Sequence, residues 1–126
     1  MSIEKALGKY LADNVSLVSG RVHSIKLPQG AVLPALTFPR ISTVPLYSHD
    51  GFSHLTTCRF QVSCWAMKHG DVREIASEVR DVLEGYSGLM GSVQIGKCLC
   101  KGDRDMHDPE TGIFHAPVDF EIEFNE

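Results

Sequence analysis

The chain has 126 residues, which is enough for one domain around one hydrophobic core. Its 12 Lys and Arg against 16 Asp and Glu give a net charge of -4, and without a basic stripe this disfavours direct binding of nucleic acid phosphates. The composition is that of an ordinary globular domain, and no apolar run is long enough to span a bilayer. The N-terminal "MSIEKALGKYLADN" is too charged for a secretory signal, so we expect folding in a cytoplasm and no membrane partner.

The first predicted element is a helix that Ser2 caps. Gly8 weakens this helix slightly, and a turn at Ser19 and Gly20 follows it. One side of the helix is apolar at intervals of three and four residues, which predicts packing against a core. This side consists of Ile3, Ala6, Leu7, Tyr10 and Leu11.

Three extended segments come next. The segment "RVHSIKL" reads as a short strand that Pro28 ends. In "ALTFPRIS", Pro39 cannot donate a hydrogen bond to a ladder, so it belongs at a sheet edge or a bulge. The segment "TTCRFQVSCWA" alternates cleanly, with Cys58, Phe60, Val62 and Cys64 on one side, and predicts a strand.

Between the second and third of these segments lies "TVPLYSHDGFSHL", residues 43–55. Asp50 and Gly51 form a pair favoured at hairpin tips. Tyr47 and Phe52 have no periodic helix or strand around them that would bury them. We interpret residues 43–55 as a long loop or arm with exposed aromatic side chains.

A second helix is predicted from Asp71, as its cap, to Gly85, a residue suited to the left-handed end of a helix. The segment "SVQIGKCLC" is a strand whose alternation breaks at Gly96, as at a bulge. A charged connection, "KGDRDMHDPETG", leads to the last strand, "FHAPVDFEIEF". Without regular alternation of strands and helices, the pattern favours an α+β fold over a doubly wound one. We predict a single domain over residues 1–126, with an antiparallel sheet of four to five strands and both helices on one face.

Two groups of acidic residues could suggest a reaction centre or a metal site. Asp119, Glu121 and Glu123 project from one side of one strand, which is typical of the solvated face of a half-buried sheet. The connection lacks the glycine and terminal glutamate of a calcium loop, and "DPETG" reads as a turn. We therefore expect no metal site. The acids of this connection are Asp103, Asp105, Asp108 and Glu110.

The cysteines and histidines give little support for catalysis. The spacings of Cys58, Cys64, Cys98 and Cys100 fit neither a zinc site nor a disulfide framework, and Cys58 and Cys64 share the apolar side of a strand. Cys64 with His69 is the one pair worth testing as a thiol dyad. No phosphate loop or nucleophile elbow is present in the sequence, so we expect neither an enzyme nor a cofactor.

Several segments in order resemble the tail-completion proteins of long-tailed phages and prophages, also called tail terminators or head-tail joining proteins. The resemblance covers nearly the whole chain and is strongest in "LPQGAVLPAL", in the strand that ends in "CWA", and in "DPETG" before the last strand. It implies a structural virion protein, assembled in the host cytoplasm, that forms a homohexameric ring at the head-proximal end of the tail tube. Such a ring ends tube polymerisation and contacts both the tube protein and the head connector proteins.

This resemblance and the residue pattern together give two expectations for surfaces. The arm orders against a neighbouring subunit through Tyr47, His49, Asp50, Phe52 and His54. The acids of the connection, Asp103, Asp105, Asp108 and Glu110, face a lumen through which DNA passes without specific binding, because like charges repel. The alternatives are another small virion ring component, either a connector adaptor or a tube subunit, and a small thiol-dependent enzyme.

Overall fold

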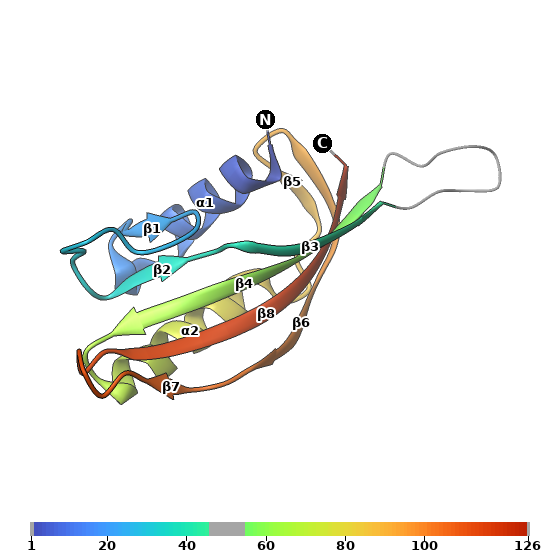
Figure 1. The fold of residues 1–126 in the computed structure, drawn as a ribbon. Coiled ribbons are helices and arrows are strands. Elements are labelled where there is room, and N and C mark those ends of the chain that lie inside the picture. The colour runs from blue at the N-terminus through green and yellow to red at the C-terminus, as the bar shows by residue number, and fades with distance from the viewer. Residues whose placement is uncertain (1, 46–54, 126) are drawn as a thin grey trace.

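The computed structural model describes residues 2–45 and 55–125, which form two helices and one eight-stranded sheet (Figure 1). In chain order the elements are α1 (Ile3–Asn14), the 3-10 turn η1 (Ser16–Val18), β1 (Val22–His23), β2 (Ala35–Thr37), β3 (Arg40–Pro45), β4 (Thr56–Ala66), α2 (His69–Leu83), β5 (Gly88–Met90), β6 (Val93–Asp103), β7 (Met106–His107) and β8 (Phe114–Asn125). The predicted α+β class is confirmed.

The sheet has the strand order β1-β2-β4-β8-β6-β5, with β3 also beside β4 and β7 also beside β8. β1 and β2 are parallel, and the other described pairs are antiparallel. The prediction of a purely antiparallel sheet of four to five strands is therefore wrong. Strands of two or three residues, such as β1, β5 and β7, are too short to show a period in the sequence.

The two segments with the most regular alternation, β4 and β8, are neighbours at the centre of the sheet. Their ladder runs from Thr56 opposite Phe124 to Ala66 opposite Phe114 without a register shift. β6 flanks β8, and its register shifts between Ile95 and Lys97, which confirms the bulge predicted at Gly96.

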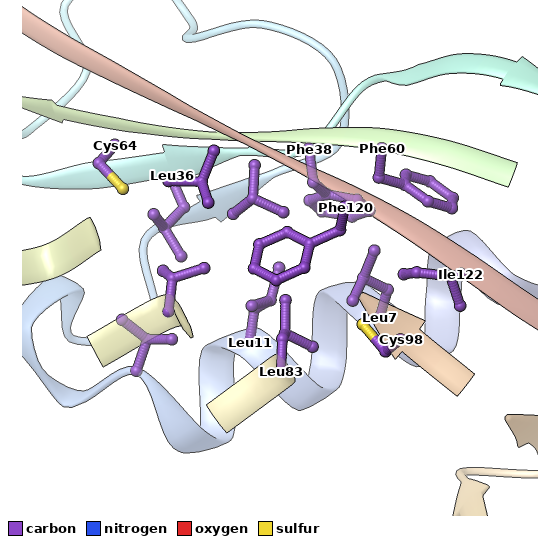
Figure 2. Packing of buried hydrophobic residues seen from close by; sticks show 14 of the residues in the cluster. Leu7, Leu11, Leu36, Phe38, Phe60, Cys64, Leu83, Cys98, Phe120 and Ile122 are labelled. Carbon is purple, nitrogen blue, oxygen red and sulfur yellow. The ribbon is translucent and has the colours of Figure 1, made fainter. Parts of the chain in front are cut away.

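Both helices cover the same face of the sheet, as predicted (Figure 1). Figure 2 shows Phe120 of β8 pointing toward Leu11 of α1 and Leu83 of α2. All three are fully buried, and so are Cys58 and Cys64 of β4, as the sequence predicts. Burial of large apolar side chains in this layer stabilises the fold by about 1.5–3 kcal/mol for each.

The helix ends follow the predictions except at one residue. Ser2 Oγ accepts a hydrogen bond from the Lys5 amide at 3.2 Å, and Gly85 has φ +76° after α2, which confirms both predicted ends. The predicted cap at Asp71 is wrong, because α2 begins at His69 after Lys68. Asp71 lies instead within the first turn, where a carboxylate still interacts favourably with the helix dipole.

Gly8 has a packing role that its helix propensity does not reveal. A Cβ atom at this position would lie 2.9 Å from Cζ and 3.3 Å from Cε1 of Phe38. Phe38 follows β2 and is only 4% exposed, so a shift of its ring would disturb the packed core around it. Gly8 thus lets the buried aromatic ring rest directly on the α1 backbone.

Two segments at the margins of the sheet differ in how their backbone groups are used. At β6, the Gly85 amide donates to the Cys98 carbonyl at 2.8 Å, and Glu84 Oε2 accepts from the Cys100 amide at 2.5 Å. The end of α2 therefore occupies hydrogen-bonding groups that an added strand would need. Within the described residues, no strand pairs with the outer side of β3.

Candidate functional site

The predicted interface residues of the arm, Tyr47, His49, Asp50, Phe52 and His54, lie outside the described residues. The flanking strands are described, and Thr43–Pro45, predicted as the start of the arm, belong to β3. Ile41 and Val44 of β3 are 56% and 57% exposed. Exposed apolar side chains on an edge strand form a candidate contact surface for another chain.

The first two acids predicted to face a lumen, Asp103 and Asp105, lie against α2 instead of standing free. Asp103 forms ion pairs of 3.6 Å with Nη1 of Arg73 and with Nη1 of Arg80. Asp105 lies 2.9 Å from Arg73 Nε and 2.9 Å from His69 Nε2. The hydrogen bond from His69, helped by the charge of Arg73, lowers the pKa of Asp105. These carboxylates attach the connection after β6 to α2.

The other two acids, Asp108 and Glu110, lie in the turn that the sequence predicts. Asp108 Oδ1 accepts from the Glu110 amide at 3.0 Å, and Oδ2 accepts from the Thr111 hydroxyl at 2.9 Å. These hydrogen bonds lower the pKa of Asp108, and Gly112 ends the turn at φ +76°. Glu110 is exposed. The four predicted acids therefore occupy two separate settings and form no single cluster.

The acids of β8 form a row on the face of the sheet away from the helices, as predicted. Each is partly exposed and lies near one cation from β6 or from the residue after it. The pairs are Asp119–Arg104 at 3.6 Å, Glu121–Lys101 at 3.4 Å and Glu123–Lys97 at 3.8 Å. Exposed pairs of this kind contribute about 0–1 kcal/mol each. The row is a solvated, charge-balanced surface with no features of a reaction centre.

The outer face of α2 carries more negative charge than the open face of the sheet. Asp71, Glu74 and Asp81 are exposed there. Glu78, on the same line of the helix, accepts hydrogen bonds from Ser16 Oγ at 2.8 Å and from the Leu17 amide at 3.1 Å. Helical periodicity in the sequence alone does not distinguish a solvated face from a contact surface.

The end of the sheet has a pocket that no pattern in the sequence predicts. Trp65 of β4 and His115 of β8 are opposite each other, and their rings stack at 3.7 Å with an interplanar angle of 6°. Trp65 Nε1 donates to the Thr37 hydroxyl at 3.0 Å, which fixes the indole. The pocket beside them has a volume of about 200 Å³. Its lining consists of Trp65, Met106, His107, Asp108, Thr111, Ile113 and His115.

The stacked wall of this pocket is uncharged near pH 7. Burial, with a smaller effect of the Arg104 charge, lowers the pKa of His115 to about 4. His115 is therefore neutral near pH 7, and its buried Nε2 has no hydrogen-bond partner among the described residues. One signal in the sequence could have pointed here, since Trp65 is an aromatic residue on the otherwise polar side of the β4 alternation.

The candidate thiol dyad does not form. His69 Nε2 is bound to Asp105, and Cys64 is fully buried in the core. Burial raises the pKa of the Cys64 thiol to about 12, so it stays protonated near pH 7. The described parts of the chain also bring no three His, Cys, Asp or Glu side chains together in an arrangement that could hold a metal ion.

A comparison with protein families places this fold. The family model described as "Tail completion protein gp17" matches residues 6–124, from within α1 to the end of β8. The chain belongs to this family. The predicted resemblance to tail-completion proteins is thereby confirmed, and membership of the family supports a structural role in a phage-type tail.

A solved structure shows the same fold as this tail completion protein. The structure titled "Virion of native gene transfer agent (GTA) particle" contains a chain that superposes with a TM-score of 0.80 and 13% sequence identity. The match covers 99% of the present chain and 96% of that chain. No curated protein sequence matches the chain. Neither α1 nor α2, the helices of the described part, is long and apolar enough to cross a membrane.

Proposed function

We propose that the protein forms a ring of identical subunits, a hexamer, at the head-proximal end of a phage tail tube. In this position the ring ends tube polymerisation and joins the tail to the head connector proteins. The observation that carries the proposal is the match to the tail completion family over residues 6–124. The virion title of the structural relative supports a place in a particle of this type.

Features of the surface support a role in assembly. A cyclic ring needs two different contact surfaces on each subunit, because each copy contacts its neighbours head to tail. The open edge at β3, with Ile41 and Val44 exposed, is one candidate, and the pocket beside Trp65 is another. Tyr47, His49, Asp50, Phe52 and His54 remain proposed subunit contacts.

For the lumen we retain the proposal that acidic residues repel DNA during passage. Glu110 is the strongest candidate of the four, because Asp103 and Asp105 are paired with cations of α2 and Asp108 lines the pocket beside Trp65. A ring of this kind binds DNA weakly and with little dependence on salt. Tight binding in low salt that falls steeply as salt is added would contradict a repelling lumen.

The alternative functions are less well supported. A connector adaptor is expected to be dominated by helices, whereas this chain has eight strands and two α-helices within its described residues. A thiol enzyme requires a reactive thiolate, and the raised pKa of Cys64 opposes one. A tube subunit would also assemble with other copies of itself. It differs from the proposed ring in that it polymerises into long tubes.

The test is the mass of the protein in solution, with and without purified tail tubes, followed by electron microscopy of the tubes. We expect a ring of defined mass, formed alone or on the tube, seated at one end of each tube and blocking further growth. Replacement of Tyr47 and Phe52 by Ser is expected to leave a folded monomer. Open-ended growth of the protein into tubes, or tubes that elongate equally with and without it, would contradict the terminator role.

A further inference from the structure

The pocket beside Trp65 lies at the opposite end of β4 from residues 46–54. Trp65 is opposite His115, whereas Thr56, at the start of β4, is opposite Phe124 at the other end of the ladder. In Figure 1, β7 at the pocket end and the paired ends of β3 and β4 are at opposite ends of the sheet. Nine residue steps along β4 separate Thr56 from Trp65, which corresponds to about 30 Å.

The pocket has the size and surface of a receptor for one aromatic ring. Its volume is about 200 Å³, and an apolar protein cavity of about 150 Å³ is large enough for benzene. The stacked pair Trp65 and His115 provides a flat wall, and Ile113 and Met106 provide apolar, adaptable surface. Met106 is 49% exposed, so the pocket is accessible from outside.

The chain contains aromatic residues that could fill such a pocket. Within a single copy, however, these residues cannot reach the pocket. Residues 46–54 include Tyr47 and Phe52, and they connect Pro45 of β3 to Leu55, just before β4. A segment that leaves at Pro45 and returns at Leu55 has ten steps, so its farthest point lies at most about 17 Å from the strand ends. This is well short of the distance of about 30 Å along β4.

We propose that the pocket lined by Trp65, Met106, Ile113 and His115 receives an aromatic side chain from residues 46–54 of a second copy of this chain. The inference rests on the proposed ring and names the receiving surface within it. Each copy then contributes an aromatic side chain at one end of β4 and accepts one in the pocket at the other end. This is the head-to-tail arrangement that closes a ring. Neutral His115 keeps its stacked wall with Trp65 uncharged near pH 7, and the Asp108 carboxylate in the same lining is already held by the Glu110 amide and the Thr111 hydroxyl.

The experiment uses the full chain with a photoreactive benzophenone amino acid at position 47 or 52, in rings made from a mixture of heavy-isotope and ordinary subunits. After irradiation, mass spectrometry identifies the crosslinked peptides. We expect crosslinks between heavy and light copies that join position 47 or 52 to residues 106–115 or Trp65. Crosslinks to other parts of the neighbouring copy, in rings that form normally, would overturn the inference and leave the ring intact.

A pair of matched variants adds a quantitative test. Met106→Asp places a charge at the pocket, and Ile25→Asp places the same charge on a residue that is 71% exposed and outside the pocket lining. We expect Met106→Asp to weaken subunit association by at least about tenfold, as for a central interface residue, and Ile25→Asp to change it less than about twofold. Equal effects of the two variants would show that the pocket is not the surface through which subunits associate.

Two other outcomes would distinguish a failure of the pocket from a failure of the proposed ring. If position 47 or 52 crosslinks only to purified tube protein added to the mixture, the occupant of the pocket is not a second copy and the inference is wrong. If the chain stays monomeric both alone and on tail tubes, the proposed ring fails, and the inference fails with it. The first result therefore affects only the pocket, whereas the second affects the function as well.

Discussion

Replacing Gly8 by Ala tests whether the contact between α1 and Phe38 determines stability. By helix propensity alone, Ala in place of a helical Gly stabilises by about 1 kcal/mol. At position 8 the new methyl group would lie 2.9 Å and 3.3 Å from two ring atoms of Phe38, inside the 3.5–4.0 Å of a favourable contact. Overpacking of a buried site costs about 1–3 kcal/mol, so the clash exceeds the propensity gain. We expect a net destabilisation of about 1 kcal/mol.

Gly70→Ala is the matched control, because Gly70 lies in α2 and its added methyl group would meet no atom within 4 Å. This variant is expected to stabilise by up to about 1 kcal/mol. In a Phe38→Leu background the ring edge is gone, and Gly8→Ala should then stabilise as well. The coupling between positions 8 and 38 is therefore expected to be about 2 kcal/mol.

The assay is urea unfolding followed by the fluorescence of Trp65, the one tryptophan of the chain. A shift of the midpoint at constant slope reports a change in stability, and measurements at two protein concentrations separate folding from assembly. If Gly8→Ala raises the midpoint as much as Gly70→Ala does, the contact with Phe38 does not restrict position 8 and the reasoning is wrong.

Two further predictions follow from the titrating groups. The pKa of His115 in the folded chain is lowered from 6.5 to about 4. As the pH falls, the unfolded chain therefore binds a proton at this residue before the folded chain does. The stability that this group contributes is present above pH 6.5 and is lost as the pH falls toward 4. His115→Phe should flatten this loss relative to the natural chain, and an NMR titration that places His115 near 6.5 would contradict it. Cys64, buried and with a pKa of about 12, should react with a thiol reagent at neutral pH far more slowly than a free thiol, and after the partly exposed Cys100; mass spectrometry of the labelled peptides would show the opposite order if Cys64 were activated.

The sequence predicts the parts of the fold that depend on local periodicity. β4 and β8 each bury one side against the helices and leave the other side partly exposed. Their sequences therefore alternate between apolar and polar residues. The cap at Ser2 and the turn around Asp108 also follow from side chains that bond to backbone groups close in sequence. These features need no knowledge of distant residues.

What the sequence does not predict depends on distant partners. β1 is a strand only because Val22 and His23 pair with β2, and two residues carry no period. Asp103 and Asp105 are drawn to Arg73 of α2, about thirty residues earlier, which no spacing rule indicates. The pocket likewise requires Trp65 and His115, fifty residues apart, to meet across a ladder.

The difference between the two segments at the sheet margins limits how the molecule can grow. A strand could add along the outer side of β3, whereas on β6 the backbone groups of Cys98 and Cys100 are already occupied by Gly85 and Glu84. The segment of β6 around Cys98 and Cys100 therefore cannot accept a strand from another copy unless these hydrogen bonds break. The open edge at β3 and the occupied segment of β6 are therefore not interchangeable surfaces for a neighbouring copy.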